Sequence, residues 1–180
     1  MTILKIAKLG HPVLHTKAQY VKKLPDPEIE KLILDMTDTM IDANGIGLAA
    51  PQVHINKQVL LFRIIKENKE NQDDNIEITA LINPKIRNLS EETNNDWEGC
   101  LSIPNMSGLV KRFSRIEYEG LDMNGKIIKK IAEGLQARII QHEYDHLNGI
   151  LYTKRLAHKD AFGFEEEIEN YWKENEKKEN

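Results

Sequence analysis

The sequence has little cysteine and no long apolar run. Cys100 is the one cysteine among 180 residues, so the chain forms no internal disulfide. No apolar run approaches the ~20 residues that are needed to cross a bilayer. The first six residues lack the apolar core and cleavage site of a secretory signal, and they lack the Arg- and Ser-rich character of a transit peptide. The sequence therefore predicts a cytoplasmic protein, and an unpaired cysteine agrees with a reducing compartment.

Basic residues are in deficit. The chain has 25 Lys and Arg against 29 Asp and Glu, a net charge of −4, whereas nucleic-acid-binding proteins normally carry a basic excess. Hydrophobic residues make up 40% and charged residues 30%, which is typical of a soluble globular protein. This length allows one domain with a sizeable core and is short for two. We expect a single domain over 1–180 with a frayed tail at about 173–180, and no dedicated nucleic-acid or membrane binding.

The most informative segment contains the pattern His-Glu-x-x-His. On a helix His142 and His146 lie one turn apart on the same side, so that both imidazoles can reach one metal ion. Glu143 lies within roughly 100° of both, and its carboxylate can therefore reach a water held by that metal. A bare match also occurs by chance on surface helices. Leu135 and Ile139 extend the histidine face with apolar residues, which favours a helix and a real site.

A catalytic zinc-like centre usually takes three protein ligands and a water, so the pattern needs a third ligand. Tyr152 stands where one peptidase pattern has a third histidine, and a neutral phenol is a poor ligand near pH 7. A glutamate at 165–167 would instead give a zinc endopeptidase. Cys100 is the better candidate, because Gly99 allows close backbone approach and Glu98 is an unusual neighbour for a purely apolar cysteine. The residues alone leave the glutamates open.

A second segment, Gly45–Gln52, is rich in small residues. It contains Gly-x-Gly, but neither Gly-x-Gly-x-x-Gly nor a following Lys-Ser/Thr completes a nucleotide loop. We therefore exclude nucleotide binding. The segment favours a tight loop that lines a cleft, with Gln52 as a fixed amide donor, although a plain glycine-rich turn fits it equally well.

The remaining patterns predict an α+β fold. Asp26 can cap a helix that starts at Pro27, carries one apolar face and ends by 44–45. Asn124-Gly125 between two strand-like runs predicts a hairpin. The other expected elements are strands at 59–65 and 79–83 (the latter closed by Pro84), hairpin strands at 116–121 and 127–131, an exposed loop at 66–75 and a C-terminal helix within 160–178.

Three segments, Gly45–Gln52, Glu98–Ser102 and Gln141–His146, resemble in order and spacing the three signature motifs of the peptide deformylase family. Gly10–Leu14 adds to the likeness, which extends to about Leu156. The resemblance implies antiparallel strands wrapped around a central metal-binding helix, with an N-terminal and a C-terminal helix. It also implies removal of the formyl group, as formate, from the N-terminal formyl-methionine of newly synthesised bacterial polypeptides.

The resemblance further implies the roles of the site residues. Its metal ligands are Cys100, His142 and His146, and its catalytic carboxylate is Glu143. The cofactor it implies is one divalent ion, Fe²⁺ in cells, with Zn²⁺, Ni²⁺ or Co²⁺ possible in purified protein. In line with it, we expect the Gln52 amide and the Leu101 backbone N–H to stabilise the oxyanion.

The expected partners are formyl-methionyl nascent peptides at the ribosome exit. Leu135 and Ile139 would line a slot for the methionine side chain, although they fit a plain core face equally well. Ile46 and Gly99 would pair with the peptide backbone as an added strand does. Three more residues complete the predicted substrate site: Gly45, Gly47 and Arg112.

The chain departs from the family pattern at one point near the site. Family members commonly have Val-Pro-Arg where this chain has Val110-Lys111-Arg112, so Arg112 matches and Lys111 changes that wall of the cleft. The charged loop at 66–75 also looks longer than is common. Glu98 and Asp145 are our candidates to orient an imidazole N–H.

Overall fold

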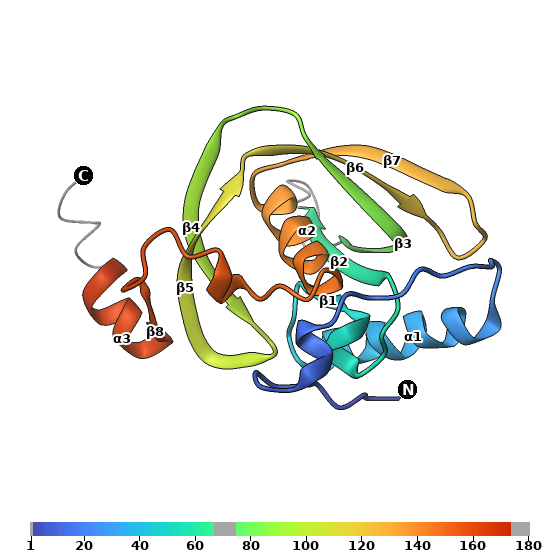
Figure 1. Cartoon of the computed structure of the whole chain (residues 1–180), viewed down its shortest axis with the longest axis horizontal. Helices are drawn as coiled ribbons and strands as arrows, with labels where there is room; N and C mark the ends of the chain where they lie inside the picture. The colour runs from blue at the N-terminus through green and yellow to red at the C-terminus, as the bar shows by residue number, and fades with distance from the viewer. Residues whose placement is uncertain (1, 67–74, 174–180) are drawn as a thin grey trace.

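The computed structural model describes residues 2–66 and 75–173, and it shows two antiparallel sheets around one central helix (Figure 1). That helix, α2 (Gly134–Leu147), contacts strands of both sheets. One sheet has the order β1-β2-β3-β6-β7 and the other β4-β5-β8. The strands are β1 (Gly47–Ala49), β2 (Val59–Lys66), β3 (Asn75–Asn88), β4 (Thr93–Cys100), β5 (Ile103–Phe113), β6 (Arg115–Leu121), β7 (Ile127–Glu133) and β8 (Phe162–Phe164). The predicted α+β class is confirmed.

Helix α1 (Pro27–Asp42) forms as the sequence predicts. The Asp26 side chain accepts a hydrogen bond of 2.9 Å from the Glu28 N–H, and Pro27 occupies the first turn, where its missing N–H costs nothing. The apolar face packs against the five-stranded sheet around β1 and β2. The short 3-10 helices are η1 (Pro12–His15), η2 (Ala50–Val53) and η3 (Tyr152–Lys154).

The predicted hairpin also forms, between β6 and β7. Oδ1 of Asp122 accepts hydrogen bonds from the N–H groups of Asn124 (2.9 Å) and Lys126 (2.8 Å). Gly125 has a φ of 79°, a left-handed conformation that glycine adopts without a Cβ penalty. The turn therefore follows from these local residues.

The strand predicted at 79–83 is longer than expected, because β3 continues through Pro84 to Asn88. The register shifts between Ile82 and Lys85, and Asn83 has a φ of 54°. Such a bulge leaves one residue outside the ladder, so a proline without an N–H is tolerated there. The Asn83 side chain meanwhile bonds both backbone groups of Val21.

Two long strands, β4 and β5, were not predicted. They pair from Thr93 opposite Phe113 to Gly99 opposite Ser107. Polar and small residues interrupt the alternation of apolar residues in both strands, so the sequence pattern does not reveal them.

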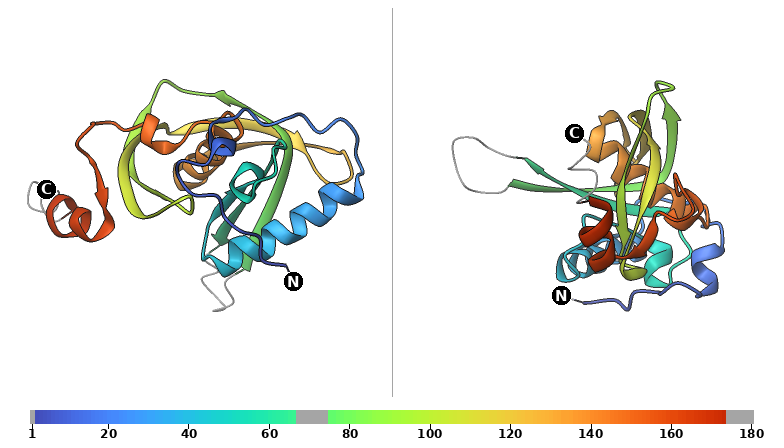
Figure 2. Two further views of the ribbon diagram at one scale, coloured as in Figure 1. Left: turned by 60° about the horizontal axis from the view of Figure 1, so that its bottom comes forward. Right: turned by 90° about the vertical axis from the view of Figure 1, so that its left-hand side faces the viewer.

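The C-terminal helix is present but begins later than predicted. The helical turn α3 (Glu165–Glu167) continues as the π-helical segment η4 (Ile168–Lys173), and both lie at the end of the molecule opposite α1 (Figure 2). Residues 162–164 form β8, which pairs with β5 instead of joining the helix. The loop predicted at 66–75 and the frayed tail predicted at 173–180 fall mostly on residues 67–74 and 174–180, outside the described residues. Among the described helices, none has the length and apolar character needed to span a membrane.

Candidate metal centre and active site

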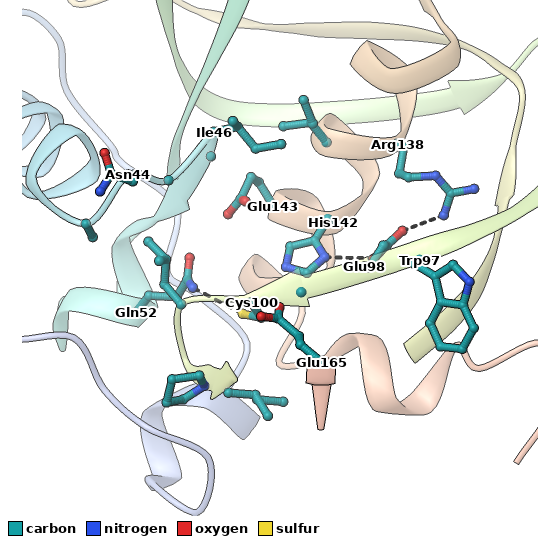
Figure 3. Close-up of a pocket in the computed structure, with 18 of the residues that line it drawn as sticks. Asn44, Ile46, Gln52, Trp97, Glu98, Cys100, Arg138, His142, Glu143 and Glu165 are labelled. Atoms are coloured by element: carbon teal, nitrogen blue, oxygen red, sulfur yellow. Dashed lines mark hydrogen bonds and ion pairs between the residues drawn. The ribbon is translucent and has the colours of Figure 1, made fainter. Parts of the chain in front are cut away.

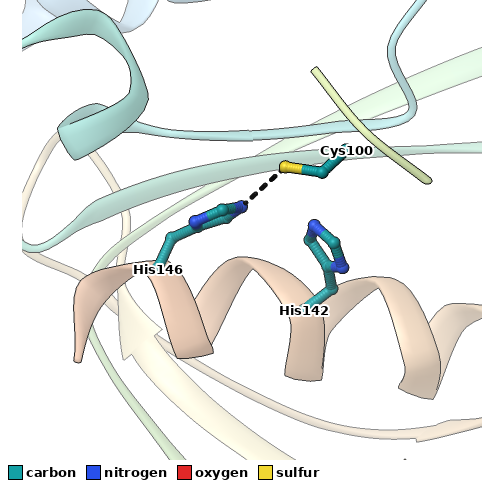
Figure 4. A group of neighbouring side chains, drawn as sticks. All are labelled: Cys100, His142 and His146. Atoms are coloured by element: carbon teal, nitrogen blue, oxygen red, sulfur yellow. Dashed lines mark hydrogen bonds between the residues drawn. The ribbon is translucent and has the colours of Figure 1, made fainter. Parts of the chain in front are cut away.

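Cys100, His142 and His146 converge between the two sheets (Figure 4). The sulfur and one ring nitrogen of each histidine all lie within 4.8 Å of one another, and Sγ of Cys100 lies 3.3 Å from Nε2 of His146. One thiolate and two imidazoles are a donor set that suits a divalent transition metal, with a fourth position left for water or substrate. The three residues therefore fit a catalytic metal centre.

Two local features produce this convergence. Helix α2 sets the two imidazoles one turn apart, with ring centroids separated by 5.0 Å. The register of β4 against β5 shifts between Gly99 and Cys100, next to the turn into β5. Strand irregularities of this kind re-aim a side chain, and here the cysteine sulfur faces the helix.

Glu98 holds the ring of His142. Its Oε2 lies 2.8 Å from Nδ1 of His142, which leaves Nε2 of that ring for the metal. Glu98 is buried, and its Oε1 accepts hydrogen bonds from Nε of Arg112 (2.9 Å) and Nη1 of Arg138 (2.8 Å). Burial raises the pKa of Glu98, but the hydrogen bonds from His142 and Arg112 outweigh it and hold this pKa at about 2. Glu98 is therefore an ionised carboxylate at neutral pH, and it orients an imidazole ring as the sequence predicted.

Asp145 does not share that role. Its carboxylate accepts hydrogen bonds from Arg112 and Arg155, whereas Nδ1 of His146 is buried without a hydrogen-bond partner in the described part of the chain. The sequence also predicted that Arg112 contacts the substrate, and the structure corrects this prediction. The Arg112 side chain is 4% exposed and its donors are used by Glu98 and Asp145, so it lies behind the metal ligands and does not line the cavity.

The sequence did not lead us to predict Arg138 as a residue of this site. Its Nη1 donates to Glu98 and to the Val110 carbonyl (2.9 Å), and its Nη2 donates to Oδ1 of Asn94 (2.8 Å). These bonds tie α2 to β4 and β5. The available signal was its position, one helical turn before His142 on the ligand face.

Glu143 and Gln52 are buried beside the metal ligands (Figure 3). Oε2 of Glu143 is buried without a hydrogen-bond partner in the described part of the chain, and burial raises the pKa of this carboxyl to about 7. Oε1 of Gln52 accepts a 2.8 Å hydrogen bond from the Ala49 N–H. This bond fixes the orientation of the side-chain amide, so that its NH₂ group points away from Ala49. That Nε2 lies 3.5 Å from Sγ of Cys100 and 3.2 Å from Oγ of Ser102. An amide donor therefore faces the metal centre.

These side chains open into a cavity of about 620 Å³. Leu135, 65% exposed, lies at its open side, and Ile139, 7% exposed, lies in its wall. The cavity is bordered by β1 and β4, each the edge strand of its sheet. Other lining residues, which the sequence did not predict as part of the substrate site, include Trp97, Ile103, Pro104, Asn105 and Glu165, the last of which the sequence offered only as an alternative metal ligand. The predicted residues in its lining are Gly45, Ile46, Gly47, Gln52, Gly99, Cys100, Leu101, Leu135, Ile139, His142 and Glu143.

This fold and site define a metal-dependent hydrolase in which a helical His-Glu-x-x-His is completed by a cysteine from an edge strand. Residues 3–162 match the family model described as polypeptide deformylase, and the chain belongs to the peptide deformylase family. It is 44% identical over 159 residues to peptide deformylase 1 of Nitrosomonas europaea, covering 88% of this chain and 90% of the relative. It is also 44% identical over 161 residues to peptide deformylase 2 of Ralstonia nicotianae, covering 89% and 91%.

Solved structures agree with this assignment. A class I type b peptide deformylase from Acinetobacter baumannii, bound to Met-Ala-Ser, superposes with a TM-score of 0.78 at 35% identity, covering 86% of this chain and 99% of the other. The peptide deformylase of Thermotoga maritima gives the same TM-score and identity and covers 88% and 100%.

The chain is therefore a metalloenzyme that removes the N-terminal formyl group from newly synthesised polypeptides. The alternative of a zinc endopeptidase with a glutamate at 165–167 as third ligand is not supported. Among the described residues, the group of ligand atoms that could share one metal contains Cys100 and the two histidines and none of these glutamates.

Proposed function

We propose that formyl-methionyl peptides are deformylated in this cavity, with Cys100, His142 and His146 holding one divalent metal ion. The observation that carries this proposal is the convergence of the three ligand atoms beside the unpartnered carboxylate oxygen of Glu143. When bound, such a metal polarises a carbonyl and lowers the pKa of a coordinated water toward 7. A thiolate suits this role, because a thiol that coordinates a divalent transition-metal ion is deprotonated by that ion.

Glu143 moves the proton. Its side chain lines the cavity, and its Oε2 is buried without a hydrogen-bond partner among the described residues, so we assign Glu143 to accept a proton from the attacking water and to deliver it to the nitrogen of the departing amine. Formate and a peptide with a free N-terminal amine are the products. The burial that raises the pKa of Glu143 suits a group that must both accept and return a proton near neutral pH.

The side-chain amide of Gln52 and the backbone N–H of Leu101 stabilise the oxyanion that develops from the formyl oxygen. Nε2 of Gln52 is held in place because the other end of its amide is bonded to Ala49. Leu101 follows Cys100 directly and lines the cavity, and its carbonyl accepts a 2.8 Å bond from Nζ of Lys8, which fixes this turn. Donors fixed before the reaction need no reorganisation as charge develops.

The peptide lies between the two edge strands. Among the described strands, none pairs with the outer edge of β1 or of β4 at the cavity, so an extended peptide can add to either. The Ile46 carbonyl already accepts a 2.9 Å bond from the Arg63 N–H, so we assign the Ile46 N–H, together with Gly99, to the peptide backbone. Gly45 and Gly47 flank Ile46, and a Cβ added to them would stand 2.9 Å from Cδ1 of Leu101 and 2.3 Å from Oε1 of Glu143, so this segment packs closely against both residues. We place the methionine side chain against Ile139 and Leu135, and the tripeptide in the A. baumannii structure also begins with methionine.

We further propose Fe²⁺ as the metal in cells, with Zn²⁺, Ni²⁺ or Co²⁺ replacing it during purification. Two imidazoles and a thiolate accept all four ions. The whole chain, 1–180, would act as one catalytic domain in the bacterial cytoplasm. Its partners would be nascent formyl-methionyl peptides as they leave the ribosome.

Formate release from formyl-Met-Ala-Ser, measured anaerobically on protein of known metal content, tests the proposal. We expect one formate per free amine produced and a rate that rises in proportion to iron content. The unacylated peptide Met-Ala-Ser is the control, and its peptide bonds should stay intact. Fully metal-loaded protein that releases no formate would contradict the proposed function.

A further inference from the structure

Glu165, the first residue of α3, brings a carboxylate to the active-site cavity. Figure 3 shows its side chain among those that line the cavity. Its Oε1 lies 3.4 Å from the point where a Cβ on Gly99 would stand. Because Gly99 has no side chain, a peptide that lies along the edge of β4 passes directly beside this carboxylate. The residues matched by the family model end at 162, so Glu165 lies outside the part of the chain that the family model describes.

The other charged groups of the cavity lining already have roles. Arg138 donates to Glu98 and to the β4 and β5 backbone, and Glu98 is shared by His142 and two guanidinium groups. Glu143 belongs to the reaction. Glu165 is exposed, and its carboxylate makes no hydrogen bond or ion pair with the described residues. The described lining therefore holds one negative charge that neither the fold nor the reaction neutralises.

We propose that Glu165 is a specificity-determining residue. It favours formylated peptides that have Lys or Arg at the second or third position, where formyl-methionine is the first. This inference rests on the proposed function, because it uses the placement of the peptide along Gly99. With the formyl group at Cys100 and the methionine side chain against Ile139, the next residues pass along the β4 edge. Each residue of an extended peptide advances about 3.3 Å, so a long cationic side chain from either position reaches the carboxylate.

The expected effect is modest and sensitive to salt. Glu165 is solvent-exposed, and forming an exposed ion pair changes a binding constant or kcat/KM by about two- to fivefold. The preference should act mainly through KM, since the carboxylate is not among the groups that we assign to the chemical step. It should weaken as ionic strength rises toward 1 M, where the screening length falls to about 3 Å.

Matched peptides on the full-length, metal-loaded enzyme test this inference. kcat/KM would be measured for formyl-Met-Lys-Ser against formyl-Met-Gln-Ser, and for formyl-Met-Ala-Lys against formyl-Met-Ala-Gln. We expect the wild type to prefer Lys about two- to fivefold in at least one pair. Glu165→Gln should bring that ratio to one. Glu165→Lys should turn the preference toward a peptide with Glu at the same position. Glu166→Gln, at the next and also exposed residue of α3, should keep the wild-type ratio.

A Lys/Gln ratio of one in both wild-type pairs, or an unchanged ratio in Glu165→Gln, would overturn the inference while formate release continued to support the proposed function. Absence of formate release from all four peptides would instead reject the proposed function, and the inference with it.

Discussion

A carbon atom added to Gly47 would stand 2.3 Å from Oε1 of Glu143, well inside van der Waals contact. The same point lies 2.8 Å from Cδ and Cγ of that side chain. β1 therefore passes so close to α2 that the carboxylate of Glu143 occupies the space where a β1 side chain would otherwise be. The segment Gly45–Gln52, which the sequence predicted as a tight loop, thus contains strand β1 and the start of η2, and it both makes room for Glu143 and lines the cavity.

Gly47→Ala should displace Glu143 and lower formate release by about 10²-fold, because a shift of about 1 Å in a reacting group can cost this much. Metal content should be unchanged. Gly163→Ala is the control, since a Cβ there would meet its nearest neighbour at 3.7 Å, an ordinary contact. Equal activity in both variants would show that Glu143 tolerates the displacement.

Glu143→Ala should keep one metal per chain and lose turnover by about 10²–10⁴-fold, the range of general acid–base catalysis. The three ligand atoms come from other residues, so metal binding does not depend on this carboxylate. Metal analysis and formate release on the same sample provide the measurement. Near-normal turnover would remove Glu143 from the proton transfer.

Cys100→Ala should lose the metal, because it removes one of three protein ligands and leaves two imidazoles one helical turn apart. The measurement is metal content after gel filtration in buffer without added metal. A variant that retained stoichiometric metal would show that another group completes the coordination.

Gln52→Ala should lower kcat by about 10²–10³-fold, as expected for the loss of one oxyanion donor. It also leaves the buried Ala49 N–H without its acceptor, so stability should be measured by urea unfolding in parallel. Gln52→Glu keeps that acceptor and removes the donor, and it should show the same loss of kcat. Normal kcat in Gln52→Glu would exclude the amide as an oxyanion donor.

Arg112→Ala should destabilise the fold by about 1–3 kcal/mol, because the buried Glu98 and Asp145 lose the hydrogen bonds of the guanidinium that they share, although Arg138 and Arg155 still bind them. The free energy of unfolding in urea measures this. Arg87→Ala is the matched control, since it breaks an exposed pair with Glu117 and should have a far smaller effect. A similar cost for both variants would mean that burial does not strengthen the Arg112 network.

Several features could be read from the sequence because they depend on neighbouring residues. The helical period places His142 and His146 on one face whatever surrounds the helix. Asp26 and Pro27 start α1, and Gly125 allows the β6–β7 turn, through hydrogen bonds and backbone angles that involve only a few consecutive residues. The α+β class and the family likeness follow from such local patterns.

Tertiary structure alone decided the rest. Cys100 lies 46 residues from His146 in the chain, and only the pairing of β4 with β5 and their packing on α2 brings the two together. The same packing put Arg112 behind Glu98 instead of in the cavity, and it carried Glu165 to the cavity from the C-terminal end. Residues distant in the chain meet through the alignment of strands and the filling of a shared core, and no short run of sequence records that alignment.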